Sequence, residues 1–418
     1  MGSYTDLIVN GRVIYTTKSY PSEIINWVFT QDDILIYDEI DQISTENGQT
    51  TSKHLREVHL LLTTATNMLD RLNILGYNES SIKKEFESFL FQKNEEINDA
   101  GHLNIYGSEI VEKEKEFWRN ANFEKWKKAV SEIFQDSFKF ITVKDYDTSL
   151  YNIESHICFQ GTELITSMPF TTFLGALTFI LISVPSDSEI IQDYSEIYNG
   201  GWVDDETIID TSVREKTIIL TEGLSDISIL KPCLKLLYPH LYDFYSFFDF
   251  EGYNNQGGAG NLVNLIKSFA GAGIRNKLIA IFDNDSAAKD AQLSLTNLNL
   301  PNHFKIINYP NLDLANNYPT IGPTGIHNTN INGLACSIEM YLGEDVLINE
   351  KEEYVPIQWK GFIPKVNAYQ GELLDKSTIQ KKFLQKLKLA QSDDGANISN
   401  QDWTGLTSIF KAIFNCFN

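Results

Sequence analysis

The fold of the carboxyl-terminal half is decided by two stretches, TIILTEGLSD at residues 217–226 and AIFDND at residues 280–285. In each stretch a run of apolar residues is followed by an acidic residue, Glu222 after one threonine in the first and Asp283 directly in the second. Short apolar runs bounded by polar turn signals predict buried β-strands. The sequence therefore predicts two strands whose ends carry carboxylates.

Strand-like and helix-like segments alternate around these two stretches. Strands are predicted at residues 217–220, 244–248, 277–282 and 303–309, and helices at residues 225–238, 260–272 and 286–298. This alternation is typical of an α/β fold with a parallel sheet and right-handed crossovers. Ligands on such a sheet bind at the carboxyl ends of the strands.

The acidic residues at the two strand ends predict a metal site. Like charges held close together are unfavourable unless a cation or a proton neutralises them, and carboxylates are the ligands that Mg²⁺ and Mn²⁺ prefer. Asp283 and Asp285 share one face of an extended segment, so both can reach one ion. Gly223 permits a turn directly after Glu222. An Asp-x-Asp pair alone is common in loops, so the combination with Glu222 and Asp226 carries the prediction.

The first two hundred residues are expected to be mainly helical after an opening hairpin. Apolar and polar residues alternate on both sides of Asn10-Gly11, a pair that favours a tight β-turn. Apolar residues at helical spacing predict one long helix over residues 54–75, a second over residues 112–134 and a third near Leu174.

A change of composition marks the boundary between the two halves. Residues 186–214 are rich in Asp, Glu, Ser and Gly, which is typical of a linker. We therefore expect one domain at residues 1–205 and a second at residues 206–345. Residues 346–418 are expected to form an extension that completes the second domain.

Acidic residues outnumber basic ones, since 56 Asp and Glu against 34 Lys and Arg give a net charge of -22. Proteins that bind nucleic acid through its phosphates are expected to present basic surface. Any contact with nucleic acid is therefore expected to be confined to a local patch or to be made through a partner.

Other features predict a cytoplasmic protein without membrane contact. The opening residues show no charged leader followed by an apolar stretch. The longest apolar run, residues 170–184, is interrupted by threonines and bounded by prolines, so we expect a buried core helix there. The four cysteines are far apart, which predicts neither a zinc site nor a disulfide framework.

Glu222-Gly223 with Asp226, followed by Asp283-Asn284-Asp285, resembles the Toprim signature. That signature is shared by topoisomerases, bacterial primases, small nucleases and overcoming-lysogenization-defect (OLD) nucleases. The opening MGSYTD and the helical half resemble the HEPN/Toprim-associated amino-terminal domain of bacterial proteins. The resemblance implies a Rossmann-like Toprim sheet preceded by a mainly α-helical HEPN-like domain, and a nuclease of bacterial defence against phage.

The resemblance also implies roles for individual residues. Glu222 would act as general acid/base or metal ligand, with Lys376 neutralising charge in the transition state. The implied ligands of Mg²⁺ or Mn²⁺ are Glu222, Asp226, Asp283, Asp285 and Glu339. Glu339 and Lys376 follow from OLD-type relatives, in which a later acid and a lysine complete a two-metal site. The alternatives are an exposed helical acid for Glu339 and an ordinary surface lysine for Lys376.

Two segments are candidates for contact with substrate. Residues 252–260 are rich in glycine, and Gly257 and Gly258 could offer backbone N–H groups to a phosphate. The segment lacks the Gly-Lys-Ser/Thr ending of a P-loop, so ATP binding is not predicted, and a plain loop is the alternative.

The second segment is the lysine-rich stretch at residues 376–388. On a helix whose Phe383, Leu384 and Leu387 face inward, Lys381 and Lys382 would contact phosphates. A solvated face of an amphipathic helix is the alternative.

The amino-terminal half is predicted to lack catalytic residues. Active HEPN ribonucleases resemble one another in an Arg followed four to six residues later by His. Here Arg56 and His59 are too close, and no Arg lies shortly before His156. We therefore interpret both histidines as structural, and this half as a module for interaction or dimerisation.

The sequence as a whole predicts a metal-dependent nuclease that acts on nucleic acid, with DNA favoured over RNA. A homodimer through the helical half and a partner protein of a defence system are expected. The rival interpretation is a regulatory module that binds metal or nucleic acid without turnover. A phosphatase with an Asp-x-Asp nucleophile is disfavoured, because the threonine motif that should follow Asp283 is absent. A primase is disfavoured by the missing zinc module.

Overall fold

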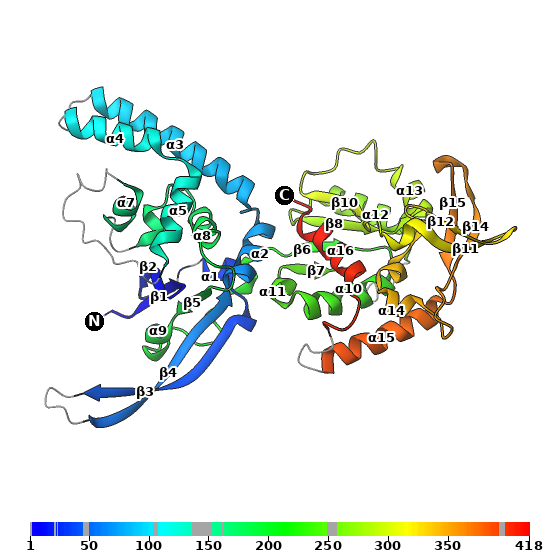
Figure 1. Cartoon of the computed structure of the whole chain (residues 1–418), viewed down its shortest axis with the longest axis horizontal. Helices are drawn as coiled ribbons and strands as arrows, with labels where there is room; N and C mark the ends of the chain where they lie inside the picture. Colours follow the sequence, from blue (N-terminus) through cyan, green and yellow to red (C-terminus); the bar gives the residue numbers. More distant parts are fainter. Residues whose placement is uncertain are drawn as a thin grey trace. The chain divides into compact units, whose positions relative to one another are not determined.

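A computed structural model gives the structure of the chain (Figure 1). It describes residues 2–20, 22, 24–44, 50–102, 108–135, 152–159, 163–248, 257–392 and 398–418. The chain divides into two compact units, Met1–Arg214 and Glu215–Phe417, and the last residue, Asn418, is grouped with the first unit. We describe each unit by itself and call them unit 1 and unit 2.

Unit 1 is built on a five-stranded antiparallel sheet of order β2-β1-β5-β4-β3. Its strands are β1 (Tyr4–Val9), β2 (Arg12–Lys18), β3 (Ile34–Ser44), β4 (Thr50–Thr64) and β5 (Glu189–Asp193). The predicted hairpin is confirmed: β1 and β2 pair through a turn at Asn10 and Gly11, whose φ angles of 47° and 74° fit that turn. β3 and β4 continue beyond the other strands as a long two-stranded ribbon (Figure 1).

Helices complete unit 1 around a large apolar core. They are α1 (Ile25–Val28), α2 (Ala65–Leu75), α3 (Glu79–His102), α4 (Ser108–Asn120), α5 (Phe123–Ile133), α7 (Ile153–Phe159), α8 (Phe173–Leu181) and α9 (Ser195–Asn199). The predicted core helix is confirmed in α8, which is capped by Thr172 and buried from Gly175 to Leu181. In the described part of the chain, no helix has the length and apolar character needed to cross a membrane.

The prediction of one helix over residues 54–75 is wrong. Residues up to Thr64 belong to β4, and the helix α2 begins at Ala65. Short apolar runs do not separate strand from helix by periodicity alone, and here pairing with both β3 and β5 decides in favour of a strand. The helix predicted over residues 112–134 is two helices, since Asn122 caps α5 through the Lys125 N–H. The prediction that the first two hundred residues are mainly helical is therefore incomplete, because it omits the five-stranded sheet.

Unit 2 contains the predicted parallel sheet, with four strands in the order β10-β8-β6-β7. The strands are β6 (Thr217–Leu220), β7 (Tyr245–Phe247), β8 (Leu278–Phe282) and β10 (Phe304–Asn308). The helices between them are α10 (Leu224–Leu237), α11 (Pro239–Tyr242), α12 (Ala259–Gly271) and α13 (Ser286–Gln292). The α/β alternation is confirmed, and α13 is shorter than predicted.

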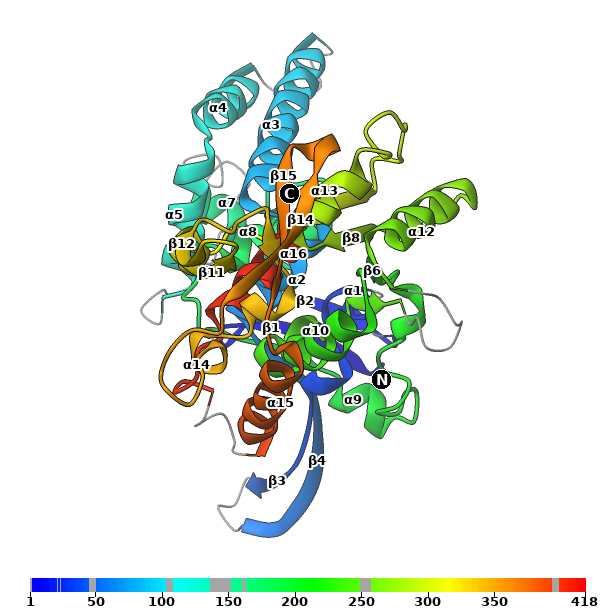
Figure 2. The same ribbon diagram turned by 90° about the vertical axis from the view of Figure 1, so that its right-hand side faces the viewer.

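Two further sheets in unit 2 were not predicted. One has the order β12-β11-β14-β15 and the other pairs β13 with β9. Their strands are β9 (Asn284–Asp285), β11 (Tyr318–Gly322), β12 (Gly325–Thr329), β13 (Ala335–Cys336), β14 (Ile357–Ile363) and β15 (Ala368–Leu373). The remaining helices are α14 (Glu344–Leu347), α15 (Lys376–Ser392) and α16 (Thr404–Phe414). β14 and β15 lie beside α13 (Figures 1 and 2).

A buried ion pair in unit 1 provides a test of this fold. Arg71 on α2 donates to both carboxylate oxygens of Asp33, at 2.7 and 3.0 Å, and the two residues are 1% and 8% exposed. We expect Arg71→Met to lower the free energy of unfolding by about 3–5 kcal/mol, because it leaves a buried charge without its partner. Denaturant unfolding of the full chain measures this. Arg71→Met with Asp33→Asn should recover part of the loss, whereas an unchanged midpoint for Arg71→Met would contradict the assignment.

Candidate functional site

The parallel sheet brings the two acidic motifs together. β6 and β8 are neighbours in register, with Leu220 opposite Ala280, so their carboxyl ends lie at the same edge. Asp283 directly follows β8 and Glu222 lies two residues past β6. The Asp283 N–H donates to Glu222 Oε1 at 2.9 Å. A hydrogen bond thus joins the first residue of one motif to the first residue of the other.

Asp226 belongs to the same group and also shapes the start of α10. Gly223 is the N-cap of this helix, and its N–H donates to Asp226 Oδ2 at 2.8 Å. The other oxygen, Oδ1, accepts a hydrogen bond from the Tyr309 hydroxyl at 3.1 Å. The four-residue spacing from Glu222 to Asp226 therefore has a local cause, since the third residue of a helix can bond back to the cap.

The two aspartates of the Asp-x-Asp motif have different surroundings. Asp285 caps α13 through the Ala288 N–H at 2.7 Å, and its Oδ2 accepts from Gln370 Nε2 at 2.7 Å. Asp283 Oδ1 is sealed from solvent and has no hydrogen-bond partner within the described residues. Asp285 is therefore held by protein contacts on both oxygens, whereas Asp283 keeps an acceptor that none of these residues satisfies.

Burial and mutual repulsion make this group of carboxylates hard to ionise. Burial raises the pKa of Glu222 to about 7, although the hydrogen bond from the Asp283 N–H acts to lower it. Burial also raises the pKa of Asp226 to about 6, although the hydrogen bond from the Tyr309 hydroxyl acts to lower it. The pKa of Asp283 is raised well above its usual value by burial and then by the charges of Asp226 and Glu222. A proton or a cation would relieve this cost.

The structure also brings Glu339 and Lys376 to this group. Glu339 is 3% exposed, so it is not an exposed helical acid. It accepts from Ser337 Oγ at 2.5 Å and Gln380 Nε2 at 2.9 Å, and Lys376 Nζ lies 3.6 Å from its Oε2. The charge of Glu339 contributes to the raised pKa of Asp226, and that of Lys376 opposes it. Residues far apart in the sequence thus share one electrostatic environment.

The described part of the glycine-rich loop lies against Glu222. The Gly258 N–H donates to the Glu222 carbonyl at 2.6 Å, with Gly258 at a φ of 108° that favours glycine. A Cβ atom at Gly257 would lie 3.1 Å from the same carbonyl oxygen. Residues 252–256 of the predicted loop lie outside the described residues.

The lysine-rich stretch is not one basic face. Lys381 is exposed, but Lys382 Nζ donates to the Ile348 carbonyl at 2.7 Å. Lys386 is buried against Asp345 Oδ1 at 2.8 Å and the Trp403 ring at 4.6 Å. The prediction that Leu384 faces inward is wrong, because it is 47% exposed. Lys386 takes the inward position instead, since it can pair with Asp345.

The carboxylates are chemically suited to bind a divalent cation, but their side chains do not form a complete metal site. In the described ranges, no three His, Cys, Asp or Glu side chains converge as a metal-binding group. The carboxylates of Glu222, Asp226, Asp283 and Asp285 nevertheless offer hard oxygens, the type that Mg²⁺ takes. The sealed Asp283 oxygen is the acceptor in most need of a cation.

His59 and His156 of unit 1 occupy packed positions. His59 is fully buried, its Nδ1 lies 2.9 Å from Asp205 Oδ1, and its ring stacks on Tyr198. His156 packs against Phe117 and two tryptophans, and burial lowers its pKa to about 4. These surroundings fit the structural interpretation of both residues.

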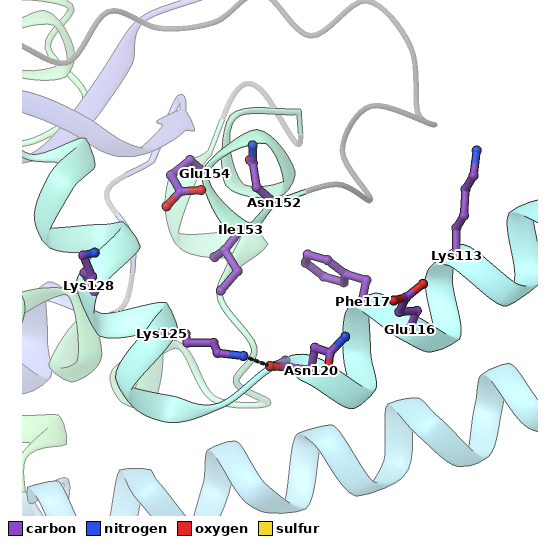
Figure 3. Close-up of a pocket in the computed structure, with 10 residues that line it drawn as sticks. Lys113, Glu116, Phe117, Asn120, Lys125, Lys128, Asn152, Ile153 and Glu154 are labelled. Atoms are coloured by element: carbon purple, nitrogen blue, oxygen red, sulfur yellow. Dashed lines mark hydrogen bonds between the residues drawn. The ribbon is translucent and has the colours of Figure 1, made fainter.

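Unit 1 also contains a cavity of about 590 Å³ between α4, α5 and α7 (Figure 3). It is lined by Lys113, Glu116, Phe117, Asn120, Ala121, Lys125, Lys128, Asn152, Ile153 and Glu154. Lys125 donates to the Asn120 carbonyl at 2.9 Å, and Lys128 lies 3.6 Å from Glu132. The cavity contains none of the predicted site residues.

Sequence reasoning missed the residues that orient the carboxylates. Tyr309 could have been found, because it is the last residue of the fourth predicted strand and therefore lies at the same edge of the sheet. In the structure it directly follows β10. Gln370 and Gln380 carry no such signal, since they come from β15 and α15 in the part of the chain whose strands were not predicted.

The different surroundings of Asp283 and Asp285 predict opposite effects of mutation. We expect Asp283→Asn to raise the melting temperature in EDTA at neutral pH, because it removes a charge that folding places among other carboxylates. Asp285→Ala should lower stability by about 1 kcal/mol through loss of the helix cap. Thermal unfolding of both variants beside the wild type measures this, and an equal loss in both would contradict it.

The raised pKa values also predict how stability depends on pH. In the folded chain Glu222, Asp226 and Asp283 hold protons to higher pH than they do in the unfolded chain. We therefore expect the free energy of unfolding in EDTA to fall as the pH rises from about 4, the ordinary carboxyl pKa, to about 7. Glu222→Gln should flatten this decline and Glu350→Gln, on an exposed turn, should not. A decline of the same slope in Glu222→Gln would refute the assignment.

Comparison with known proteins identifies the amino-terminal part of the chain. The sequence model of the family described as HEPN/Toprim N-terminal domain 1 matches residues 1–216. No curated protein and no solved structure matches the chain. The matched region covers unit 1 and stops at the start of the parallel sheet. Because residues 1–216 are more than half of the 418 residues, this chain belongs to the HEPN/Toprim N-terminal domain 1 family.

Proposed function

We propose that this protein is a metal-dependent nuclease whose active site is the carboxylate group at the edge of the parallel sheet. The observation that carries the proposal is the sealed oxygen of Asp283, for which the described residues supply no hydrogen-bond partner. Asp283 lies one residue past β8 and is hydrogen-bonded through its backbone N–H to Glu222 past β6. A protein holds an acceptor in this state at a cost, and binding of a cation would offset that cost. Membership of a HEPN/Toprim family supports a nuclease-related role.

A divalent cation, Mg²⁺ or Mn²⁺, would be held by Glu222, Asp226 and Asp283. The negative charges of Glu339 and Asp285 would act on it from nearby. When bound, the cation would polarise the phosphodiester and lower the pKa of a water molecule. The pKa of Glu222, near 7, suits a group that exchanges a proton at neutral pH. Lys376, held beside Glu339, would balance negative charge on the phosphate.

The substrate we propose is nucleic acid, with DNA favoured, in bacterial defence against phage and with a relation to OLD-type nucleases. Gly257, Gly258, Lys381 and Lys382 remain proposed substrate contacts. Unit 1 would serve as the module for dimerisation or for binding a partner protein of the defence system in the cytoplasm. With a net charge of -22, contact with phosphates would be local.

A regulatory module without turnover is the second candidate. It is favoured by Asp285, both of whose oxygens already accept hydrogen bonds from the protein. In such a module the carboxylates would bind a cation that changes stability and partner affinity, but no bond would be cut.

The nuclease proposal predicts cleavage that depends on metal. Purified protein is incubated with plasmid, linear and single-stranded DNA and with RNA, in Mg²⁺, Mn²⁺ or EDTA. We expect cleavage with metal that falls by at least about 100-fold in Glu222→Gln, since a general acid/base contributes on that scale. Glu350→Gln, the same chemical change at an exposed position, should cleave like the wild type.

Thermal unfolding with and without Mg²⁺ separates the two candidates. Mg²⁺ should raise the melting temperature of the wild type and have a smaller effect on Asp283→Asn. Stabilisation by Mg²⁺ without cleavage of any substrate would favour the regulatory module. Cleavage that persists in EDTA or in Glu222→Gln would contradict the proposed site.

A further inference from the structure

The hairpin formed by β14 and β15 presents three aromatic rings on one face. Phe362 and Tyr369 are direct cross-strand partners with ring centroids 5.1 Å apart, and the Trp359 ring lies 6.3 Å from that of Tyr369. Phe362 is 47% and Tyr369 57% exposed. The Trp359 ring is half-buried beside these two exposed rings, and together the three rings form an apolar face at the surface.

The local register explains why the rings gather there. The pairing shifts between Trp359 and Gly361, which places Trp359 opposite Gly371, two residues from Tyr369 on the same face. A Cβ atom at Gly371 would lie 3.2 Å from the Trp359 ring. Ile357 Cγ2 at 2.6 Å and Ala335 Cβ at 2.8 Å would be nearer still, so glycine at this position accommodates these two side chains as well as the indole. Contact between rings on neighbouring strands is enough to stabilise a hairpin. Such a structural role does not require the outer faces of the rings to stay exposed.

The charge of the hairpin differs from that of the chain. Residues 357–373 contain two lysines and one acidic residue, Glu372, within a chain of 56 acidic and 34 basic residues. Lys360 and Lys365 are 50% and 74% exposed and lie 3.4 and 3.7 Å from the carboxylates of Glu372 and Asp290. Exposed ion pairs of this kind contribute little, so a phosphate can compete for both lysines.

The same hairpin is fixed to the proposed active site. Gln370 follows Tyr369, and its Nε2 donates to Asp285 Oδ2 at 2.7 Å while its Oε1 accepts from the Ala287 N–H at 2.9 Å. Ser286 Oγ donates to the Tyr369 carbonyl at 2.9 Å. The residue that carries the central ring is therefore bonded to the residue that follows the Asp-x-Asp motif.

We propose that Trp359, Phe362 and Tyr369 form a stacking platform for the unpaired bases of single-stranded nucleic acid, with Lys360 and Lys365 contacting its phosphates. Every base has a flat face, so stacking on aromatic rings binds a strand with little sequence preference. Paired bases inside a duplex do not expose these faces, which selects single strands. This inference rests on the proposed function, because the platform adjoins Asp285 of the proposed active site. The inference names the class of substrate on which that site would act.

The test is a binding titration in EDTA, which excludes metal-dependent cleavage. The full-length protein is titrated into fluorescently labelled oligo(dT), oligo(U) and a duplex of the same length. We expect single strands to bind at least about tenfold more tightly than the duplex. Phe362→Leu with Tyr369→Leu keeps the apolar character but removes the flat rings, and should weaken single-strand binding by at least about tenfold.

Three further variants test whether the change in single-strand binding comes from these aromatic rings and lysines. Tyr369→Phe keeps the ring and should restore the binding that leucine at this position removes. Phe91→Leu removes an exposed ring of unit 1, 69% exposed on α3, and should have no effect. Lys360→Ala with Lys365→Ala leaves the rings in place and should reduce the dependence of log affinity on log salt by about 0.7 for each phosphate that is no longer neutralised.

The outcomes separate this inference from the proposed nuclease. Loss of single-strand binding in the leucine variant, with an unchanged melting temperature, supports the platform even if no metal promotes cleavage. Equal binding by wild type and leucine variant, equal binding of duplex and single strand, or no binding by the wild type would each overturn it. Cleavage that needs Glu222 but is unaffected in the leucine variant would leave the nuclease standing without the platform. If the leucine variant unfolds, the lysine variant decides: an unchanged salt dependence overturns the proposal.

Discussion

The hydrogen bond from the Asp283 N–H to the Glu222 carboxylate is the interaction on which the arrangement of unit 2 depends. It is possible because β6 and β8 are parallel neighbours, so both motifs leave the sheet at the same edge. That geometry forces carboxylates together in a place with little water, and the raised pKa values of Glu222, Asp226 and Asp283 are the result. Folding thus creates an electrostatic cost that a cation or protons must offset. We regard this cost as the chief sign of function in the chain.

The surrounding residues orient the carboxylates without neutralising them. Tyr309 donates to Asp226, Gln370 to Asp285 and Gln380 to Glu339, and each of these donors is uncharged. Lys376 is the cation that lies beside Glu339. Neutral donors fix the position of a carboxylate while leaving its charge available to a ligand. The residues after position 356 supply much of this support, so the carboxyl-terminal segment is part of the site and not an appendage.

Unit 1 has a different character. Its sheet, its core helix α8 and the buried pair of Arg71 and Asp33 are elements of a stable scaffold. His59 and His156 are enclosed by aromatic rings or paired with a carboxylate, which fits a role in packing. Family membership rests on this unit, whereas the proposed chemistry rests on the other. A division of this kind is what a protein with separate interaction and catalytic parts requires.

The sequence by itself determined the parallel sheet of unit 2 and the identity of its acidic residues, because alternating strands and helices and the chemistry after strand ends are local signals. It also determined the Asn10-Gly11 hairpin and the core helix α8. The helix predicted for residues 54–64 is wrong, because a short apolar run fits a strand and a helix equally well. Pairing with the distant strands β3 and β5 makes these residues a strand. Only the tertiary contacts show that Asp285 is bound by Gln370 while the described residues leave one oxygen of Asp283 unsatisfied, and that three rings meet on β14 and β15. Those facts depend on contacts between segments about 85 residues apart and on strand register, which no local pattern encodes.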